Sequence, residues 1–130
     1  MLTAIGDAKQ SIDIEAFAFT SRQLIEALAT AVARGVKVKV VLDPKEPYNH
    51  KTARELSAAG VNVCYYKPYD GEYLHAKILA VDAGSVVFVG SANFSYHGFF
   101  VNHEGDVELT DAYAFGKNID ADVNAQFARG

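Results

Sequence analysis

The sequence has little that would tie its fold to oxidation or to a membrane. Cys64 is the one cysteine among 130 residues, so an intrachain disulfide is excluded and folding does not depend on an oxidising compartment. Tryptophan is absent, and no apolar run approaches the length of a transmembrane helix. The first residues also lack the basic and apolar segments of a signal peptide. We therefore expect a cytoplasmic protein by default.

An excess of positive charge is missing as well. The formal net charge is −4 and the pI is about 5.5, so no overall basic field attracts nucleic acid, although a local basic cleft is compatible with these values. The apolar fraction of 50% and the charged fraction of 22% are ordinary for a globular protein. The length predicts one domain, residues 1–130.

Apolar periodicity predicts an alternation of strands and helices. Thr20 and Gln23 resemble a capping box at the start of a helix that Gly35 closes, and Pro68 with Asp70-Gly71 marks a turn. The predicted strands are 11–19, 36–42, 61–66, 74–81, 86–89 and one around 108–109, and the predicted helices are 2–10, 20–35, 50–59 and one from about 111. Short helical crossovers favour parallel early strands, and a hairpin follows them. The fold class is α/β, with a mixed, mostly parallel sheet and helices on both faces.

The segment that carries chemistry begins at His75. On a strand, His75 and Lys77 share one face because side chains repeat with period two. An imidazole and an ammonium on one face suit an anion held between them. Neutral imidazole is a good nucleophile towards phosphorus, and an ammonium neutralises a phosphoryl oxygen as its charge grows. The alternative for each residue is an ordinary solvated strand side chain.

Further polar residues follow within thirty positions. Gly90 allows close backbone approach, and Ser91 and Asn93 offer hydroxyl and amide donors to the same phosphate. Glu104 is a candidate partner for one ring nitrogen of His75, which would fix the tautomer of the ring. Asp82 ends its strand at hairpin spacing and suits an architectural role.

Together these residues resemble the phospholipase D superfamily, whose signature is His-x-Lys-x4-Asp followed by Gly-Ser-x-Asn. The signature is filled in order by His75, Lys77, Asp82, Gly90, Ser91 and Asn93. Asn102-His103-Glu104 resembles a further family landmark. Seven residues separate Asp82 from Gly90 where the common spacing is six, and we assign the extra residue to the turn at 83–85.

The resemblance implies a metal-independent phosphodiesterase or phosphatidyltransferase that needs no cofactor. His75 would attack phosphorus and form a covalent phosphohistidine, and a second histidine would protonate the leaving oxygen. Lys77 and Asn93, with Ser91 assisting, would hold the phosphate, and Glu104 would orient the nucleophile. Asp82 and Gly90 would be structural parts of the motif.

The chain contains a single copy of this set, whereas the family mechanism needs two. The resemblance implies a homodimer in which two His75 side chains meet across a two-fold axis and complete one site. The alternative is one half of a longer protein with two sets. Family domains usually begin with a strand before the first helix, and here Met1 falls about where that helix starts.

Three functions compete. The first is a nuclease-like hydrolase similar to small bacterial endonucleases of the superfamily. The second is a phospholipid hydrolase or phosphatidyltransferase resembling half of a cardiolipin synthase, favoured by aromatic residues flanking the site at Tyr65, Tyr66, Tyr69, Tyr73 and Phe99-Phe100. The third is a non-catalytic module that binds phosphate or dimerises. A metal site built from His50, His75, His97 and His103 lacks the usual ligand spacing.

Overall fold

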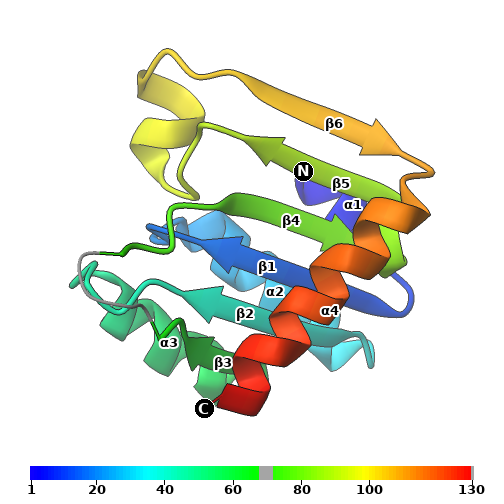
Figure 1. Cartoon of the computed structure of the whole chain (residues 1–130), viewed down its shortest axis with the longest axis horizontal. Coiled ribbons are helices and arrows are strands. Elements are labelled where there is room, and N and C mark those ends of the chain that lie inside the picture. The colour runs from blue at the N-terminus through cyan, green and yellow to red at the C-terminus, as the bar shows by residue number, and fades with distance from the viewer. Residues whose placement is uncertain (68–71, 130) are drawn as a thin grey trace.

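A six-stranded mixed sheet with helices on both faces forms the body of the molecule (Figure 1). The computed structural model describes residues 1–67 and 72–129, so the predicted turn at Pro68 and Asp70-Gly71, together with Tyr69, lies outside the described residues. The helices are α1 (Leu2–Asp7), α2 (Arg22–Ala33), α3 (Asn49–Ala58), α4 (Tyr113–Arg129), the short 3₁₀ turn η1 (Asp82–Gly84) and the π-helical turn η2 (His97–Val101). The strands are β1 (Ser11–Ala16), β2 (Lys37–Leu42), β3 (Asn62–Tyr65), β4 (Lys77–Val81), β5 (Val86–Gly90) and β6 (Asp106–Thr110).

The strand order in the described chain is β3-β2-β1-β4-β5-β6. β1, β2 and β3 pair in parallel through the two helical crossovers, and β4, β5 and β6 are added by antiparallel pairing. The predicted mixed sheet is confirmed. Four of these six strands run in one direction, although three of the five pairings are antiparallel.

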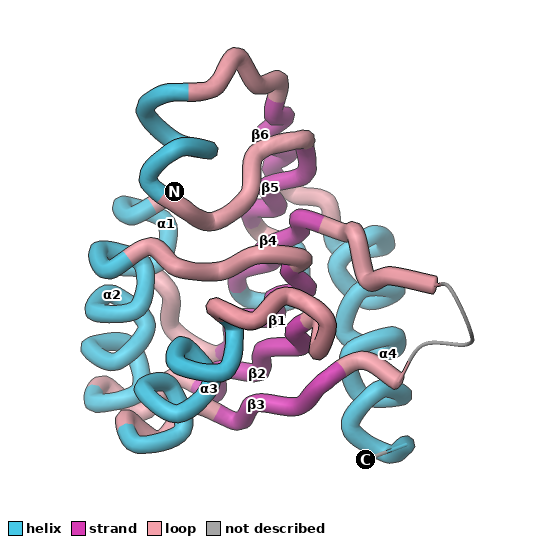
Figure 2. Tube along the Cα trace, turned by 90° about the vertical axis from the view of Figure 1, so that its left-hand side faces the viewer, coloured by secondary structure: helices cyan, strands magenta, loops and turns pink. Residues whose placement is uncertain are grey.

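Two apolar layers hold the helices to the sheet. α1, α2 and α3 lie on one face and α4 crosses the other, as Figures 1 and 2 show. Ile12 and Ile14 of β1 pack with Leu28 of α2 on the first face. Ile119 and Val123 of α4 belong to the second apolar cluster. These stripes follow from the period-two and period-3.6 patterns of the sequence.

Glycines end two helices as expected, and one predicted cap is wrong. Gly35 and Gly60 follow α2 and α3 with φ of +94° and +95°, values that residues with a Cβ rarely adopt. The cap of α2 is Ser21 instead of Thr20: the Ser21 hydroxyl accepts the amide hydrogen of Leu24 at 3.2 Å. The amides of Thr20 and Ser21 both donate to the Phe94 carbonyl, at 2.8 Å and 2.9 Å, which fixes the chain just before α2.

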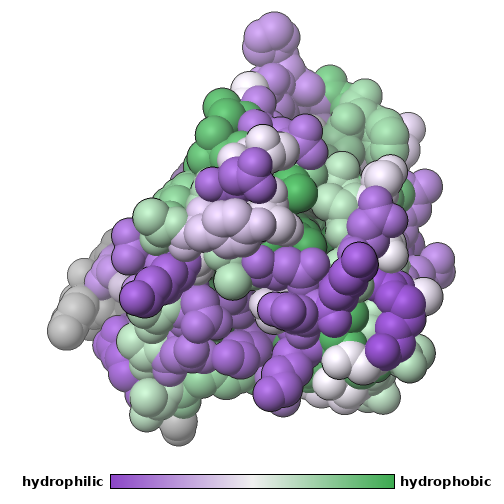
Figure 3. All heavy atoms as spheres, turned by 90° about the vertical axis from the view of Figure 1, so that its right-hand side faces the viewer, coloured by the Kyte–Doolittle hydropathy of each residue, from purple (hydrophilic) through white to green (hydrophobic). Residues whose placement is uncertain are grey.

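The strand directions place His75, Lys77 and residues 90–93 of the motif at one edge of the sheet. β1, β2, β3 and β5 end there, and β4 and β6 begin there. Figure 2 looks onto this edge and its loops, whereas Figure 3 looks onto the opposite edge, where hydrophilic side chains cover most of the surface. We refer to the first as the motif edge.

Candidate active site

His75 lies just outside the sheet. β4 begins at Lys77, so the predicted strand starts three residues too early. The Leu74 amide donates to the Asp43 carboxylate at 2.6 Å, which draws residue 74 towards the loop after β2 and away from strand pairing with β1. The His75 ring is exposed, whereas Lys77 retains only 9% of its accessible surface.

The two predicted partners nevertheless meet. Lys77 Nζ lies 2.8 Å from His75 Nδ1 and 3.4 Å from Nε2. The ring of Phe17, the residue after β1, packs on the His75 ring with centroids 4.7 Å apart and lies 5.7 Å from Lys77 Nζ. An ammonium can donate to an imidazole nitrogen only when that nitrogen carries no proton. The contact therefore fits a neutral imidazole, the form that acts as a nucleophile.

Lys77 is a buried cation at the motif edge. Burial lowers the pKa of its ammonium below the ordinary value, and the negative charge of Glu104 acts in the opposite direction. Within the described ranges Lys77 forms no salt bridge; the ion pairs are Arg22–Glu55 and Lys39–Asp120. A desolvated ammonium that lacks a bound carboxylate is suited to receive an anion.

Gly90-Ser91-Ala92-Asn93, named here the GSAN turn, begins at the last residue of β5 and is hydrogen-bonded to residues 104–106, where β6 begins. The Ser91 amide donates to the Gly105 carbonyl at 3.2 Å, and the Gly105 amide donates to Ser91 Oγ at 3.0 Å. The Ser91 hydroxyl donates to Glu104 Oε1 at 2.6 Å. The Ala92 amide donates to Asp106 Oδ1 at 3.2 Å. The backbone of the turn and the Ser91 side chain are thus held by residues 104–106.

Asn93 carries an unpartnered polar atom. Its Oδ1 is buried and has no hydrogen-bond partner among the described residues. Oxygen and nitrogen of an amide are assigned from the surrounding network, so the finding concerns a terminal amide atom of either kind. Buried polar atoms nearly always have a partner, and one left open at the motif edge is consistent with a ligand site.

Glu104 interacts with Lys77 through its charge, and among the described residues it forms no hydrogen bond with His75. Its described hydrogen bond goes to Ser91, and its charge acts on Lys77. Within the described part of the chain, the contacts of the His75 ring are with Lys77 and Phe17. The orienting role predicted for Glu104 therefore stays a prediction.

Asp82 lies at the opposite edge, at the far end of β4. Its carboxylate accepts three consecutive backbone amides at the start of β1, from Lys9 at 3.0 Å, Gln10 at 2.7 Å and Ser11 at 3.0 Å. Burial alone would raise the pKa of this carboxyl, but the three backbone donors outweigh burial and the pKa is lowered. Asp82 thus joins the β4–β5 hairpin to β1 and does not reach the other motif residues.

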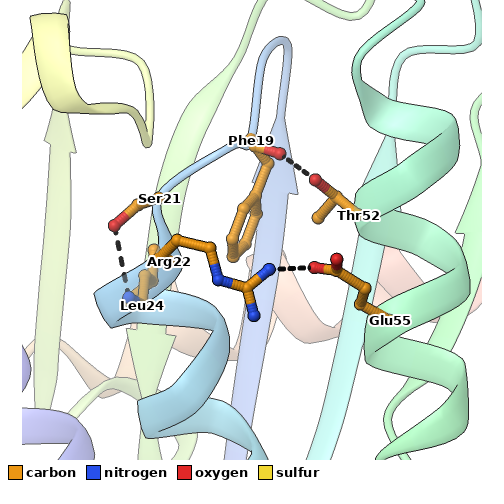
Figure 4. Close-up of polar contacts among 6 residues, drawn as sticks. All are labelled: Phe19, Ser21, Arg22, Leu24, Thr52 and Glu55. Carbon is orange, nitrogen blue, oxygen red and sulfur yellow. Dashed lines mark hydrogen bonds and ion pairs between the residues drawn. The ribbon is translucent and has the colours of Figure 1, made fainter.

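Contacts that the sequence did not reveal hold the segment after β1 in place. Asn49 of α3 is fully buried; its Nδ2 donates to the carbonyls of Phe17 at 2.7 Å and Asp43 at 3.0 Å, and its Oδ1 accepts from the Phe19 amide at 2.9 Å. The Thr52 hydroxyl donates to the Phe19 carbonyl (Figure 4). These bonds fix Phe17 beside His75.

A neighbouring ion pair joins the two helices behind this segment. Arg22 at the start of α2 reaches Glu55 of α3, as Figure 4 shows. Both side chains keep substantial solvent exposure, so the pair adds little free energy of folding. The ordering of the site rests on the buried amide of Asn49 instead.

Cys64 and the histidines offer no second chemical centre. Cys64 is half-buried in β3, and burial raises the pKa of its thiol to about 11, which disfavours the nucleophilic thiolate. Across residues 1–67 and 72–129, no cluster of three or more His, Cys, Asp or Glu side chains could hold a metal ion. In the same residues, no helix is long and apolar enough to cross a bilayer.

A family model and a solved structure connect the chain to the family indicated by the motif. The family described as "Cardiolipin synthase, PLD-like domain" matches residues 1–129. The phospholipase D family member Nuc from Salmonella typhimurium has a structure that superimposes with a TM-score of 0.88, at 26% identity, over 99% of this chain and 85% of Nuc. The chain therefore belongs to the phospholipase D superfamily, in the family of the cardiolipin synthase PLD-like domain.

Two further proteins match the chain over part of their own length. Cardiolipin synthase B of Escherichia coli strain K12 is 35% identical over 107 residues, which are 71% of this chain and 26% of that protein. The chain thus spans about a quarter of the length of this curated relative. NucT from Helicobacter pylori has the same fold, with a TM-score of 0.83 at 24% identity over 98% of this chain and 84% of NucT.

Proposed function

We propose that this chain is a metal-independent phosphodiesterase of phospholipase D type that acts through a covalent phosphohistidine on His75. The observation that carries the proposal is the buried, carboxylate-free ammonium of Lys77 in contact with the exposed His75 ring. A nucleophile and a desolvated cation at this distance suit an anionic phosphodiester. The open amide atom of Asn93 supplies a further polar group to the same anion.

Substrate binding would exchange two hydrogen bonds. Lys77 would leave His75 Nδ1 for a phosphoryl oxygen, and the Ser91 hydroxyl would leave Glu104 for another. His75, released from Lys77, would change tautomer, its ring proton moving from Nε2 to Nδ1 through solvent. The Nδ1–H group would then donate to the freed Glu104 carboxylate, and Nε2 would carry the lone pair for attack.

The reaction would proceed in two displacements. In the first, His75 Nε2 bonds to phosphorus as the bond to the leaving oxygen breaks, and a second histidine donates a proton to that oxygen. In the second, water loses a proton to the second histidine and attacks phosphorus, which breaks the P–N bond and restores His75. An alcohol in place of water would make the enzyme a transferase.

The second histidine would come from a second copy of the chain. The single motif supplies one His75, and its exposed ring at the motif edge is accessible to a partner. A two-fold axis through this edge would place two copies of His75 in one site. Light scattering should show an active dimer, and an active monomer would exclude the shared site.

We prefer a nuclease-like hydrolase, because the structure of Nuc superimposes on this chain with a TM-score of 0.88. One observation favours a phospholipid instead. A groove of about 430 Å³ is lined by Arg22 and the side chains of Tyr96 and Phe100, which are 66% and 63% exposed on and beside η2. Its lining does not include His75 or Lys77.

Hydrolysis of bis-(p-nitrophenyl) phosphate tests the mechanism. The wild-type chain should be active with EDTA present, and His75→Ala should be inactive while keeping the wild-type thermal midpoint. Activity lost on chelation would exclude the metal-independent route, and an inactive wild-type dimer would favour a non-catalytic phosphate-binding module. Parallel assays on single-stranded DNA and phospholipid vesicles separate the two substrate classes.

A further inference from the structure

The carboxylate of Asp106 occupies the space that a side chain at Gly90 would need. Gly90 and Asp106 face each other in the β5–β6 ladder. A Cβ built on Gly90 would lie 1.7 Å from Asp106 Oδ1 and 2.6 Å from its Cγ. The same Cβ would also lie 2.5 Å from the Asp106 Cα, so both the close approach of the β6 backbone and the Asp106 side chain require glycine at this position.

The same carboxylate ends at the centre of the turn. Asp106 Oδ1 accepts the amide hydrogen of Ala92 at 3.2 Å, and Ala92 lies between the two residues expected to hold phosphate, Ser91 and Asn93. The Ser91 amide is fixed separately by the Gly105 carbonyl. Two successive amides of the turn are therefore held by the start of β6, one by its backbone and one by the Asp106 side chain.

We propose that Asp106 is a positioning residue that sets the GSAN turn for phosphate binding by accepting the Ala92 amide hydrogen. This inference rests on the proposed function for the identity of the ligand, and on Asp106, Gly90 and Ala92 for the geometry. Asp106 does not touch the phosphate itself; it fixes the backbone from which the Ser91 and Asn93 side chains project. Without it, the amide of Ala92 loses its acceptor and the turn gains freedom around Ala92.

Three variants separate positioning from charge and from folding. Asp106→Ala removes the acceptor, Asp106→Asn keeps an acceptor oxygen without the charge, and Glu108→Ala is the matched control. Glu108 lies two residues along β6, is exposed, and pairs with Phe88 away from the turn. The control removes one negative charge from the same strand and should leave every readout at the wild-type value.

The first readout is amide hydrogen exchange at Ala92, measured by NMR without turnover. The second is the dissociation constant for inorganic phosphate, from the shifts of the Ser91 and Asn93 amides. Asp106→Ala should speed Ala92 exchange and weaken phosphate binding by about tenfold each, the effect of losing one hydrogen bond to a charged acceptor. Asp106→Asn should stay within about threefold of the wild type, and its thermal midpoint should match that of Glu108→Ala.

The outcomes also separate this inference from the proposed function. If Asp106→Ala leaves both Ala92 exchange and phosphate binding unchanged, positioning by Asp106 is wrong even when the wild type hydrolyses its substrate. If Asp106→Asn is as impaired as Asp106→Ala, the charge and not the acceptor matters, and the inference is overturned. A wild type that binds phosphate but does not hydrolyse phosphodiesters contradicts the proposed function alone, and the Ala92 exchange result still decides the role of Asp106.

Discussion

Asp13 of β1 and Asp120 of α4 share a hydrogen bond between their carboxyl groups. A second acid pair, Glu15 with Asp122, joins the same two elements. Each pair needs a proton, because two ionised carboxylates repel at this distance. Lys39 is the neighbouring cation; its Nζ lies 2.6 Å from Asn124 Oδ1 and 3.8 Å from Asp120. α4 therefore packs on β1 through two acid pairs, in which burial raises the pKa of Asp13 and Glu15 towards neutral pH.

We predict that the folded chain loses stability as the pH rises from about 4 to about 8. Burial, followed by the acid partner, raises the pKa of Asp13 from 3.8 to about 7 and that of Glu15 from 4.5 to about 8. Between these pKa values the folded state holds protons that the unfolded state has released. The stabilisation is therefore complete at a pH below the pKa values of the unfolded state, and it is lost as the pH rises through the pKa values of the folded state. Urea unfolding at pH 5, 7 and 9 measures the trend. The Asp13→Asn, Glu15→Gln double variant should show a flatter pH dependence, and a wild type more stable at pH 8 than at pH 5 would contradict the prediction.

Glu104 should set the alkaline limit of activity through Lys77. Its charge raises the pKa of the Lys77 ammonium against the dominant effect of burial, which lowers it. Lys77 must be protonated to hold phosphate, so activity falls as the pH rises past its pKa. In Glu104→Gln that fall should move to lower pH, as the pH dependence of kcat/KM would record. Glu108→Gln is the control. If the alkaline fall of kcat/KM stays at the same pH in Glu104→Gln, the electrostatic effect of Glu104 on Lys77 is refuted.

Asp82 should matter for stability and not for chemistry. Asp82→Ala removes the acceptor of three backbone amides, which we expect to cost about 2–4 kcal/mol in the free energy of unfolding. Asp82→Asn should cost less, since asparagine keeps an acceptor and tolerates the φ of +49° at this position. The activity per folded molecule should remain that of the wild type, because Asp82 lies at the edge opposite to His75. Urea denaturation and active-site assays on the same samples separate the two effects.

Asn49, in α3, should contribute both to the free energy of unfolding and to kcat. Asn49→Ala leaves the Phe19 amide without its acceptor and frees the carbonyl of Phe17, so we expect a loss of about 2–4 kcal/mol in unfolding free energy. Because Phe17 packs on His75, kcat should fall as well, even where the protein remains folded. Tyr48→Ala, at a neighbouring position that is 72% exposed, is the control. Full activity in folded Asn49→Ala would show that the Phe17 segment holds its place without this amide.

The elements with regular apolar periods could be predicted from the sequence. Alternation in 36–42 and the glycines after α2 and α3 determine local structure, because valine alternation favours a strand and a positive φ favours glycine. The start of β4 could not be predicted, because the hydrogen bond from Leu74 to Asp43 joins residues far apart in the sequence. Asp13 and Glu15 read as a polar strand face, yet both are buried, since α4 covers that face.

In the candidate site too, some residues could be predicted from the sequence and others are revealed only by the fold. The residue types of His75, Lys77 and the GSAN turn carry the motif, and the sheet brings them to one edge. Phe17 and Asp106 gave no comparable signal: one is an aromatic residue after an apolar strand, and the other an acid two positions beyond Glu104. Their contacts with His75 and Ala92 arise from the pairing of β1 with β4 and of β5 with β6.

In the β4–β5 hairpin, the number of residues in the turn does not determine how Lys77 and the GSAN turn lie relative to each other. Pairing from Ile78 with Val89 to Val81 with Val86 is continuous, so the extra residue between Asp82 and Gly90 is accommodated in the turn at the far edge. Lengthening or shortening that turn would leave Lys77 and the GSAN turn opposite each other. A single residue inserted within β5 would instead reverse the inward and outward faces beyond it. Natural or engineered length variation in this motif should therefore be tolerated at 83–85 and excluded from 86–90.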